Sequence, residues 1–188
     1  MQKNKTLIIA EAGVNHNGDI KIAKKLIDIA VSAGADIIKF QTFKADNLLI
    51  KKAPKAKYQI KATNKKETNY EMIKKLELSH KDHKKLFNYC NKKKIEYLSS
   101  PFDIDSIRFL TELNLKRIKI PSGEINNFQY LEAISRFKGK IIISTGMSTI
   151  KEITNTINYL YRKGIKQNQI TLLHCNSAYP TPLEDINL

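Results

Sequence analysis

Short apolar runs rich in β-branched residues alternate with segments of helical periodicity along almost the whole chain. The first run, Leu7–Ala10, is followed by apolar residues from Ile22 to Ala30 at intervals of three and four, and this period ends at Gly34. A short run of this kind is typical of a buried strand, and the spacing of three and four is typical of one face of a helix. Because the two alternate, the sequence predicts an α/β fold with a parallel sheet and helices outside it.

The alternation continues along the chain and predicts six strands. The strands are expected at residues 7–10, 37–41, 95–99, 118–120, 141–143 and 170–174, and helices around 22–30, 86–90, 107–113, 130–134 and 153–161. Asp103 or Asp105 is expected to cap the third helix, and Thr149 with Glu152 predicts a capping box.

One lysine-rich stretch departs from this rhythm. It lies between Phe43 and Ser79 and contains a short predicted helix near Met72. A long connection after the carboxyl end of a strand is often a lid or a binding loop, so we expect that role here.

Polar side chains stand where the predicted strands end. These residues are Glu11, Lys39, Gln41, Ser99, Ser100, Lys119, Ser122, Glu124, Ser144, Thr145 and His174. In a (β/α)8 TIM barrel the carboxyl ends of all strands open onto one rim, which holds the catalytic groups. The sequence therefore predicts such a barrel with a site at this rim. Eight strands take about 250 residues, so residues 1–188 are expected to be its N-terminal part, truncated after about six strands.

The charge is strongly basic, with 33 Lys and Arg against 18 Asp and Glu and a net charge of +15. Only four of the basic residues are Arg, namely Arg108, Arg117, Arg136 and Arg162. Nucleic-acid readers favour Arg, and the lysines here are scattered through the predicted helices, which favours a solvated surface. We therefore expect no nucleic-acid partner, although the positive charge would attract an anionic substrate.

Other sequence features narrow the class of protein. No apolar run approaches the roughly 20 residues that a membrane span needs, and the first run is too short for a signal peptide. We expect a cytoplasmic protein with no membrane partner. Cys90 and Cys175 are far apart and form no CxxC pair, so neither a disulfide framework nor a cysteine zinc site is predicted. Both are expected to be buried small hydrophobes.

A series of short motifs, in order along the chain, resembles the sialic acid synthase family. They are Ile9–Gly18 (IAEAGVNHNG), Lys39–Lys44 (KFQTFK), Ser100–Asp103 (SPFD), Lys119–Glu124 (KIPSGE), Ser144–Met147 (STGM), Leu173–Cys175 (LHC) and Tyr179–Pro182 (YPTP). Each motif is weak alone, but the ordered series covers about residues 7 to 188.

The resemblance implies a reaction and an architecture. The family condenses phosphoenolpyruvate with an N-acyl aminosugar aldehyde to give a nine-carbon 2-keto sugar acid and phosphate. Its members are homodimers with a (β/α)8 barrel and a small C-terminal antifreeze-like domain. A manganese or magnesium ion binds the aldehyde oxygen. The family's two metal-binding histidines lie on strands beyond residue 188, so the ligands are not assigned here, and His16 is expected to be a structural loop residue.

The resemblance also assigns roles to residues of this chain. Lys39, Lys119, Ser122 and Ser144 would bind phosphoenolpyruvate, because a carboxylate and a phosphate need cations and hydrogen-bond donors around them. Glu11, Gln41, Asn64 and Tyr179 would contact the sugar. Glu124 would move a proton or position water, and Glu11 would recognise sugar hydroxyls. The alternative is that the two carboxylates have each other's role.

Structural alternatives exist for each of these residues. A lysine at a strand end, such as Lys39, is more often solvated or salt-bridged than catalytic. Ser122 and Ser144 stand before helical segments and would also suit helix caps. Glu11 would also suit a buried structural carboxylate, and His174 and Cys175 would suit core residues.

The choice of substrate is a further prediction. The segments 40–46 and 53–60 resemble bacterial members that make sialic acid, which favours N-acetylmannosamine. The alternatives are a legionaminic or pseudaminic acid synthase and a non-catalytic truncated product. Two rivals remain, namely a barrel that makes 3-deoxy sugar acids and a basic RNA-binding or scaffold protein.

Overall fold

The computed structural model describes residues 6–50, 67–178 and 180–187, which divide into two compact units, residues 1–97 and 98–188. Asn64, Tyr179 and the segment 53–60 lie outside the described residues. Among the residues that the structure describes, no helix is both long and apolar enough to cross a bilayer.

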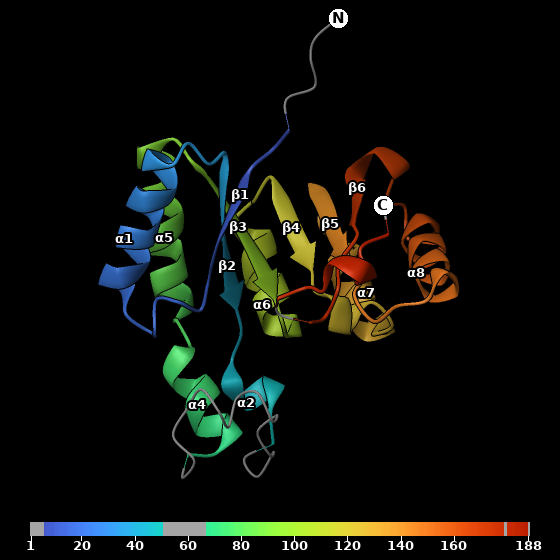
Figure 1. The fold of residues 1–188 in the computed structure, drawn as a ribbon, viewed down its shortest axis with the longest axis horizontal. Coiled ribbons are helices and arrows are strands. Elements are labelled where there is room, and N and C mark those ends of the chain that lie inside the picture. Colours follow the sequence, from blue (N-terminus) through green and yellow to red (C-terminus); the bar gives the residue numbers. More distant parts are fainter. Residues whose placement is uncertain (1–5, 51–66, 179, 188) are drawn as a thin grey trace, which may run out of the picture. The chain divides into compact units, whose positions relative to one another are not determined.

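In residues 6–50 and 67–97, the first unit has two strands, four helices and the beginning of a third strand. They are β1 (Ile9–Gly13), α1 (Ile20–Ser32), β2 (Ile37–Thr42), α2 (Ala45–Leu48), α4 (Asn69–Leu76), α5 (His80–Lys93) and β3 (Glu96–Pro101), which ends in the second unit. The sheet order is β1-β2-β3, and β1 and β2 are parallel. Helices α1 and α5 pack against each other, side by side in Figure 1.

The core of the first unit follows the predicted periodicity. Ala23, Ile27 and Ala30 form the buried face of α1, and the Phe40 ring stacks on the Tyr97 ring with centroids 5.5 Å apart. The predicted first strand is shifted, however. Leu7 and Ile8 are exposed, and the strand instead runs from Ile9 to Gly13 because its pairing with β2 begins at Ile9.

The lysine-rich stretch is more structured than the sequence predicted. The short helix expected near Met72 is α4, whose first turn is fixed by a capping box between Thr68 and Glu71. A further short helix, α2, was not predicted, because four residues are too few to display a period. Lys74 of α4 bonds the carboxylate of Asp46 in α2, at 3.1 Å, which links the two helices.

Gly18 lies where the chain leaves no room for a side chain. Its φ is +75°, and a Cβ there would lie 2.3 Å from the backbone oxygen of Lys75. We expect Gly18→Ala to lower the free energy of unfolding by about 3 kcal/mol, since a backbone oxygen cannot move aside as a side chain can. Gly34 has nearly the same φ, +73°, with nothing near a Cβ, so Gly34→Ala should cost only about 1 kcal/mol. Urea denaturation measures both, and equal losses would contradict the proposed clash.

His83 makes the stability of the first unit depend on pH. It is fully buried in α5, and its Nδ1 lies 2.8 Å from the Tyr97 hydroxyl oxygen. Burial, and then the charges of His16 and His80, lower the pKa of His83 from 6.5 to about 3. Between these values the unfolded chain binds a proton that the folded protein does not bind. The free energy of unfolding should therefore fall by about 1.4 kcal/mol per pH unit below 6.5.

Urea denaturation at several pH values between about 5 and 7 tests this prediction. In this range the proton taken up by unfolded His83 changes the free energy of unfolding more than the carboxylates do, because carboxylates titrate at lower pH. In His83→Gln the free energy of unfolding should fall less steeply with falling pH, because unfolding of this variant takes up about one proton fewer. His174→Gln is the matched control, because His174 is exposed. A wild-type slope in His83→Gln would show that His83 is not the group responsible.

The second unit contains a parallel sheet of order β4-β5-β6. Its elements are α6 (Ile104–Glu112), β4 (Arg117–Ile120), η1 (Ser122–Glu124), α7 (Phe128–Ile134), β5 (Lys140–Ser144), α8 (Ile150–Arg162), η2 (Gln167–Gln169), β6 (Ile170–Leu173) and η3 (Leu183–Asp185). The three strands run in the same direction in Figure 1. The predicted strands, helices and the parallel sheet are confirmed here.

Residue alternation gives this sheet two different faces. Ile118 and Ile120 of β4 pair with Ile141 and Ile143 of β5, and all four side chains are fully buried on one face. Because successive side chains point to opposite faces, Lys119 lies on the other face. Ser144 lies two residues after Ile142, the partner of Lys119, and so shares that face.

The predicted helix caps are confirmed. Asp103, rather than Asp105, caps α6, and its carboxylate accepts a hydrogen bond of 2.8 Å from the Ser106 N–H. Thr149 and Glu152 form the capping box of α8. These caps fix where each helix starts after its strand, and so position the loops at the carboxyl ends of the strands.

Candidate functional site

In the first unit, Glu11 and Lys39 are register partners in the neighbouring strands β1 and β2. Register partners in parallel strands project from the same face, and the Lys39 ammonium forms an ion pair with the Glu11 carboxylate. The exposed fraction is 48% for the Glu11 side chain and 14% for Lys39. The alternative of a buried structural Glu11 is therefore wrong, whereas the salt-bridged Lys39 is confirmed.

A bulge in β1 brings a third polar side chain to this pair. The register shifts between Glu11 and Gly13, and Gly13 has a φ of +53°. A Cβ on Gly13 would lie 3.0 Å from Glu11 Oε1 and 3.9 Å from Gln41 Nε2, so both side chains lie over this glycine. Glu11, Lys39 and Gln41 thus form one group, called here the β1–β2 cluster.

In the second unit, hydroxyl groups gather at the carboxyl ends of β4, β5 and β6. The Gly146 N–H donates a hydrogen bond of 3.0 Å to Ser122 Oγ, and the Cys175 thiol donates one of 3.3 Å to Ser144 Oγ. A Cβ on Gly146 would lie 2.8 Å from Ser177 Oγ and 3.0 Å from Ser122 Oγ. Lys119, Ser122, Ser144, Gly146, Cys175 and Ser177 are called here the β4–β6 cluster.

The two serines predicted from the sequence are not helix caps. Pro121, Asn127 and Thr149 occupy the N-cap positions of η1, α7 and α8. The side chains of Ser122 and Ser144 instead meet groups from the following loops, as described above. The capping alternative is therefore wrong, and both serines lie at the carboxyl ends of strands.

The two members of the β4–β6 cluster that follow β6 were not among the predicted site residues. Cys175 is only partly buried and contacts Ser144, so it is not the core residue expected, and Ser177 was not considered. The signal was present, because both residues follow β6 directly, at the same edge of the sheet as Ser122 and Ser144.

Glu124 is held in place by the residue that caps α7. Its carboxylate accepts a hydrogen bond of 2.7 Å from Asn127 Nδ2, while Asn127 Oδ1 accepts one of 3.1 Å from the Tyr130 N–H. The buried Tyr130 hydroxyl donates to the Pro101 carbonyl, and burial, followed by the charges of Glu124 and Asp103, raises its pKa. Glu124 is thus a fixed, partly exposed carboxylate.

The remaining histidines and cysteine have structural surroundings. His16 is a buried loop residue, as predicted, and its Nδ1 accepts a hydrogen bond of 3.0 Å from the Gly18 N–H. His174 is exposed and accepts from the Asn187 N–H at 3.2 Å, so its interpretation as a core residue is wrong. Cys90 is buried as expected, and burial raises its pKa to about 12.

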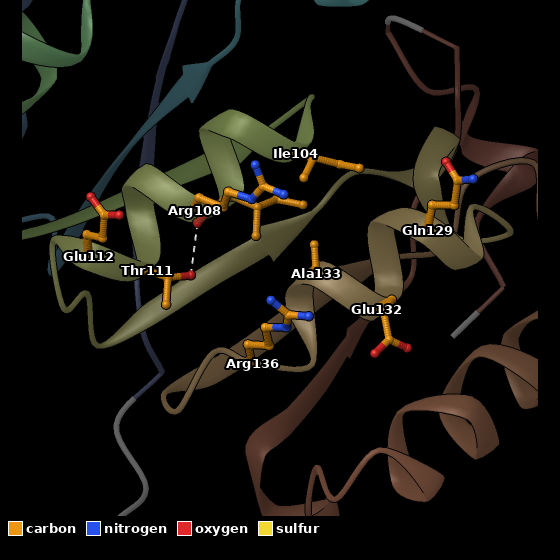
Figure 2. A pocket seen from close by; sticks show the side chains of 9 residues that line it. Ile104, Arg108, Thr111, Glu112, Gln129, Glu132, Ala133 and Arg136 are labelled. Atoms are coloured by element: carbon orange, nitrogen blue, oxygen red, sulfur yellow. Dashed lines mark hydrogen bonds between the residues drawn. The ribbon is translucent and has the colours of Figure 1, made fainter.

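Two further features bear on the location of a site. Within residues 6–50, 67–178 and 180–187, no three His, Cys, Asp or Glu side chains gather so that they could hold a metal ion, so these residues do not fit a metal site by themselves. The hollow of about 330 Å³ in Figure 2 lies between α6 and α7 and includes Arg108, Arg136 and Glu132. None of the predicted site residues lines it.

The two clusters have complementary chemistry. The β4–β6 cluster combines one cation with several hydroxyls, which are groups that bind phosphate and carboxylate oxygens. The β1–β2 cluster offers a carboxylate and an amide, which suit hydroxyl groups, together with a second cation. The β4–β6 cluster by itself suits a small polar anion, and the β1–β2 cluster by itself suits a polyol.

Comparison with known proteins identifies the family. A model of the NeuB family matches residues 26–188. The chain is 53% identical to an N,N'-diacetyllegionaminic acid synthase of Campylobacter jejuni over 98% of this chain and 55% of the relative, and 48% identical to one of Legionella pneumophila over 96% and 51%. It thus spans about half the length of the curated relatives it matches.

A solved structure supports the same assignment. The N-acetylneuraminic acid synthetase of Leptospira borgpetersenii, in complex with citrate, aligns with a TM-score of 0.82 and 32% identity over 98% of this chain and 59% of that one. This likeness confirms the expected (β/α) barrel fold and the resemblance to sialic acid synthases. The chain therefore belongs to the NeuB family.

Proposed function

We propose that the protein to which this chain belongs condenses phosphoenolpyruvate with an N-acyl aminosugar aldehyde to give a 2-keto sugar acid and phosphate. The observation that carries the proposal is the 53% identity to an N,N'-diacetyllegionaminic acid synthase over 98% of the chain. The polar groups of both clusters suit the two substrates. On the family resemblance we also propose a cytoplasmic homodimer without a nucleic-acid partner, whose metal ligands lie outside this chain.

The relatives favour a diacetylated sugar over N-acetylmannosamine. The two relatives with the highest identity quoted above are named as N,N'-diacetyllegionaminic acid synthases, so the alternative substrate class fits better than the one favoured by the sequence motifs. Phosphoenolpyruvate contains no nitrogen. Both acetamido groups of such a product must therefore come from the aldehyde, and we propose a hexose with two acetamido groups as the sugar substrate.

The β4–β6 cluster would hold phosphoenolpyruvate. Lys119 would balance negative charge, while Ser122 and Ser144 would donate hydrogen bonds to phosphate or carboxylate oxygens. The family resemblance alone assigns Lys39 to phosphoenolpyruvate as a second cation. C3 of phosphoenolpyruvate then bonds to the aldehyde carbon, water adds its oxygen to C2, and the C2–O bond to phosphate breaks to leave the ketone.

The two carboxylates would transfer protons and bind the hydroxyl groups of the sugar. Water gives up protons as it adds to C2, and the aldehyde oxygen gains one as it becomes a hydroxyl. Glu124, fixed by Asn127 and partly exposed, suits the proton transfer or the positioning of this water. Glu11 and Gln41 suit the hydroxyl and acetamido groups of the sugar, with Asn64 and Tyr179 proposed from the sequence alone.

A substrate panel tests the specificity. Phosphate release by the intact protein is measured with phosphoenolpyruvate and one of three aldehydes: a diacetamido hexose, N-acetylmannosamine or arabinose 5-phosphate. We expect kcat/KM to be at least about tenfold higher for the diacetamido hexose, since a site that bonds a second acetamido group leaves polar groups unpaired when that group is missing. A preference for N-acetylmannosamine would restore the sialic acid assignment, and a preference for arabinose 5-phosphate would overturn the proposal.

A further inference from the structure

A second hollow lies at the amino ends of the strands of the β4-β5-β6 sheet. Its volume is about 640 Å³, and it is lined by Lys116, Arg117, Lys138, Gly139, Lys140, Lys166 and Gln169. These residues lie just before or at the first residues of the three strands, which Figure 1 shows side by side. This group is called here the basic hollow. Strands of this length span roughly 13–17 Å, which separates it from the β4–β6 cluster.

The basic hollow is lined mainly by cationic side chains. Five of its seven lining residues are cations, and none is a carboxylate. Like charges held together repel, and an anion that binds among them relieves that repulsion.

Backbone hydrogen bonds hold the loops of the basic hollow together. Gln169 Nε2 donates to the carbonyls of Lys138 and Gly139 at 3.3 and 3.1 Å, and Gln169 Oε1 accepts from the Lys166 N–H at 2.9 Å. The Lys140 N–H donates to the Lys116 carbonyl at 2.9 Å. The positions from which the cationic side chains project are therefore fixed relative to one another.

Gly139 shows how closely these loops approach each other. A Cβ there would lie 2.5 Å from the backbone oxygen of Lys116 and 2.7 Å from the Phe137 ring. The position of the Lys140 ammonium is also fixed, because Nζ donates a hydrogen bond of 2.6 Å to the Asn168 carbonyl. The hollow is thus built by three loops that share one hydrogen-bonded frame.

We propose that the basic hollow binds a small anion that carries two or more linked phosphate groups. A volume of about 640 Å³ exceeds what a single phosphate fills, and five cations match an anion with several charges. Among the described residues, no aromatic side chain lines the hollow, whereas single-stranded nucleic acids bind largely by stacking their bases on such rings. The chemistry therefore favours a compact polyphosphate group, inorganic or attached to a small molecule, over an RNA.

The experiment is a calorimetric titration of the intact protein with inorganic triphosphate at about 0.15 M salt. We expect saturable binding at one site per chain. The double variant Lys138→Glu/Lys166→Glu should raise the Kd at least about tenfold. Lys81→Glu/Lys84→Glu, on the exposed face of α5, changes the net charge equally and should shift the Kd less than about twofold. Thermal melting confirms that both variants are folded.

Three outcomes would overturn the proposal, and a fourth would support it. Absence of saturation, or equal weakening by both double variants, would mean that only the net positive charge attracts the anion. Loss of triphosphate binding in Lys119→Ala would place the anion in the β4–β6 cluster instead. Tighter binding of a short single-stranded RNA, weakened by the same Lys138→Glu/Lys166→Glu change, would assign the surface to nucleic acid. A nucleoside triphosphate that binds like inorganic triphosphate would show that the phosphate chain alone is recognised.

Discussion

Replacement of Glu124 by glutamine is expected to lower kcat of the intact protein by about a hundredfold or more, because the amide cannot accept a proton. The fold should survive, since an amide oxygen still accepts the hydrogen bond that Asn127 Nδ2 donates to Glu124 at 2.7 Å. The KM for phosphoenolpyruvate should change little, because the variant keeps the shape of the side chain. Steady-state phosphate release at saturating substrates measures the effect.

Glu132→Gln is the matched control for this change. Glu132 lies on α7 and pairs with Lys163 and the Tyr159 hydroxyl, so the same carboxylate-to-amide change occurs there without a proposed role in the reaction. Wild-type kcat is expected in this variant. Wild-type turnover in Glu124→Gln would instead remove Glu124 from the proposed chemistry, and the test would pass to Glu11, the other carboxylate with an assigned role.

Removal of the cation of Lys119 should weaken the binding of phosphoenolpyruvate. A hydrogen bond between charged groups contributes about 1.5–3 kcal/mol, which corresponds to a rise of KM by about 10- to 100-fold in Lys119→Ala. Lys119 projects from the face of the sheet that it shares with Ser144, opposite the buried isoleucines, so its loss leaves the packed face intact. Melting temperature is measured alongside the kinetics.

Two further variants sharpen this test. Lys119→Arg keeps the charge and should recover part of the affinity, although the guanidinium places its donors differently. Lys151→Ala, on the exposed side of α8, removes a lysine with no proposed role and should leave KM unchanged. An unchanged KM for phosphoenolpyruvate in Lys119→Ala would show that Lys119 does not bind this anion.

Much of the fold could be predicted because burial on one face leaves a periodic trace in the sequence. The stripe of α1 and the isoleucines of β4 and β5 are such traces, and their elements lie within a few residues of the predicted bounds. Short elements leave no trace of this kind. Helix α2 and the displaced start of β1 were missed because strand pairing and tertiary contacts, rather than periodicity, decide them.

The site could be predicted only in part, for a related physical reason. Position at a strand end identified Lys39, Ser122 and Ser144, but the partners of a side chain depend on register and loop conformation. The Glu11–Lys39 ion pair needs the observed register of β1 and β2, and the meeting of Gly146 with Ser122 needs the fold of the loop after β5. Neither is visible in the spacing of residues along one strand.

The most direct test of the central claim is mass spectrometry of the product formed by the intact protein from phosphoenolpyruvate labelled with carbon-13 at all three carbons. We expect one product whose mass equals that of the aldehyde plus that of pyruvic acid labelled at all three carbons, with one phosphate released for each molecule formed. Labelled pyruvate and phosphate, with the aldehyde recovered unchanged, would show hydrolysis without formation of a carbon–carbon bond and would contradict the proposed synthase activity.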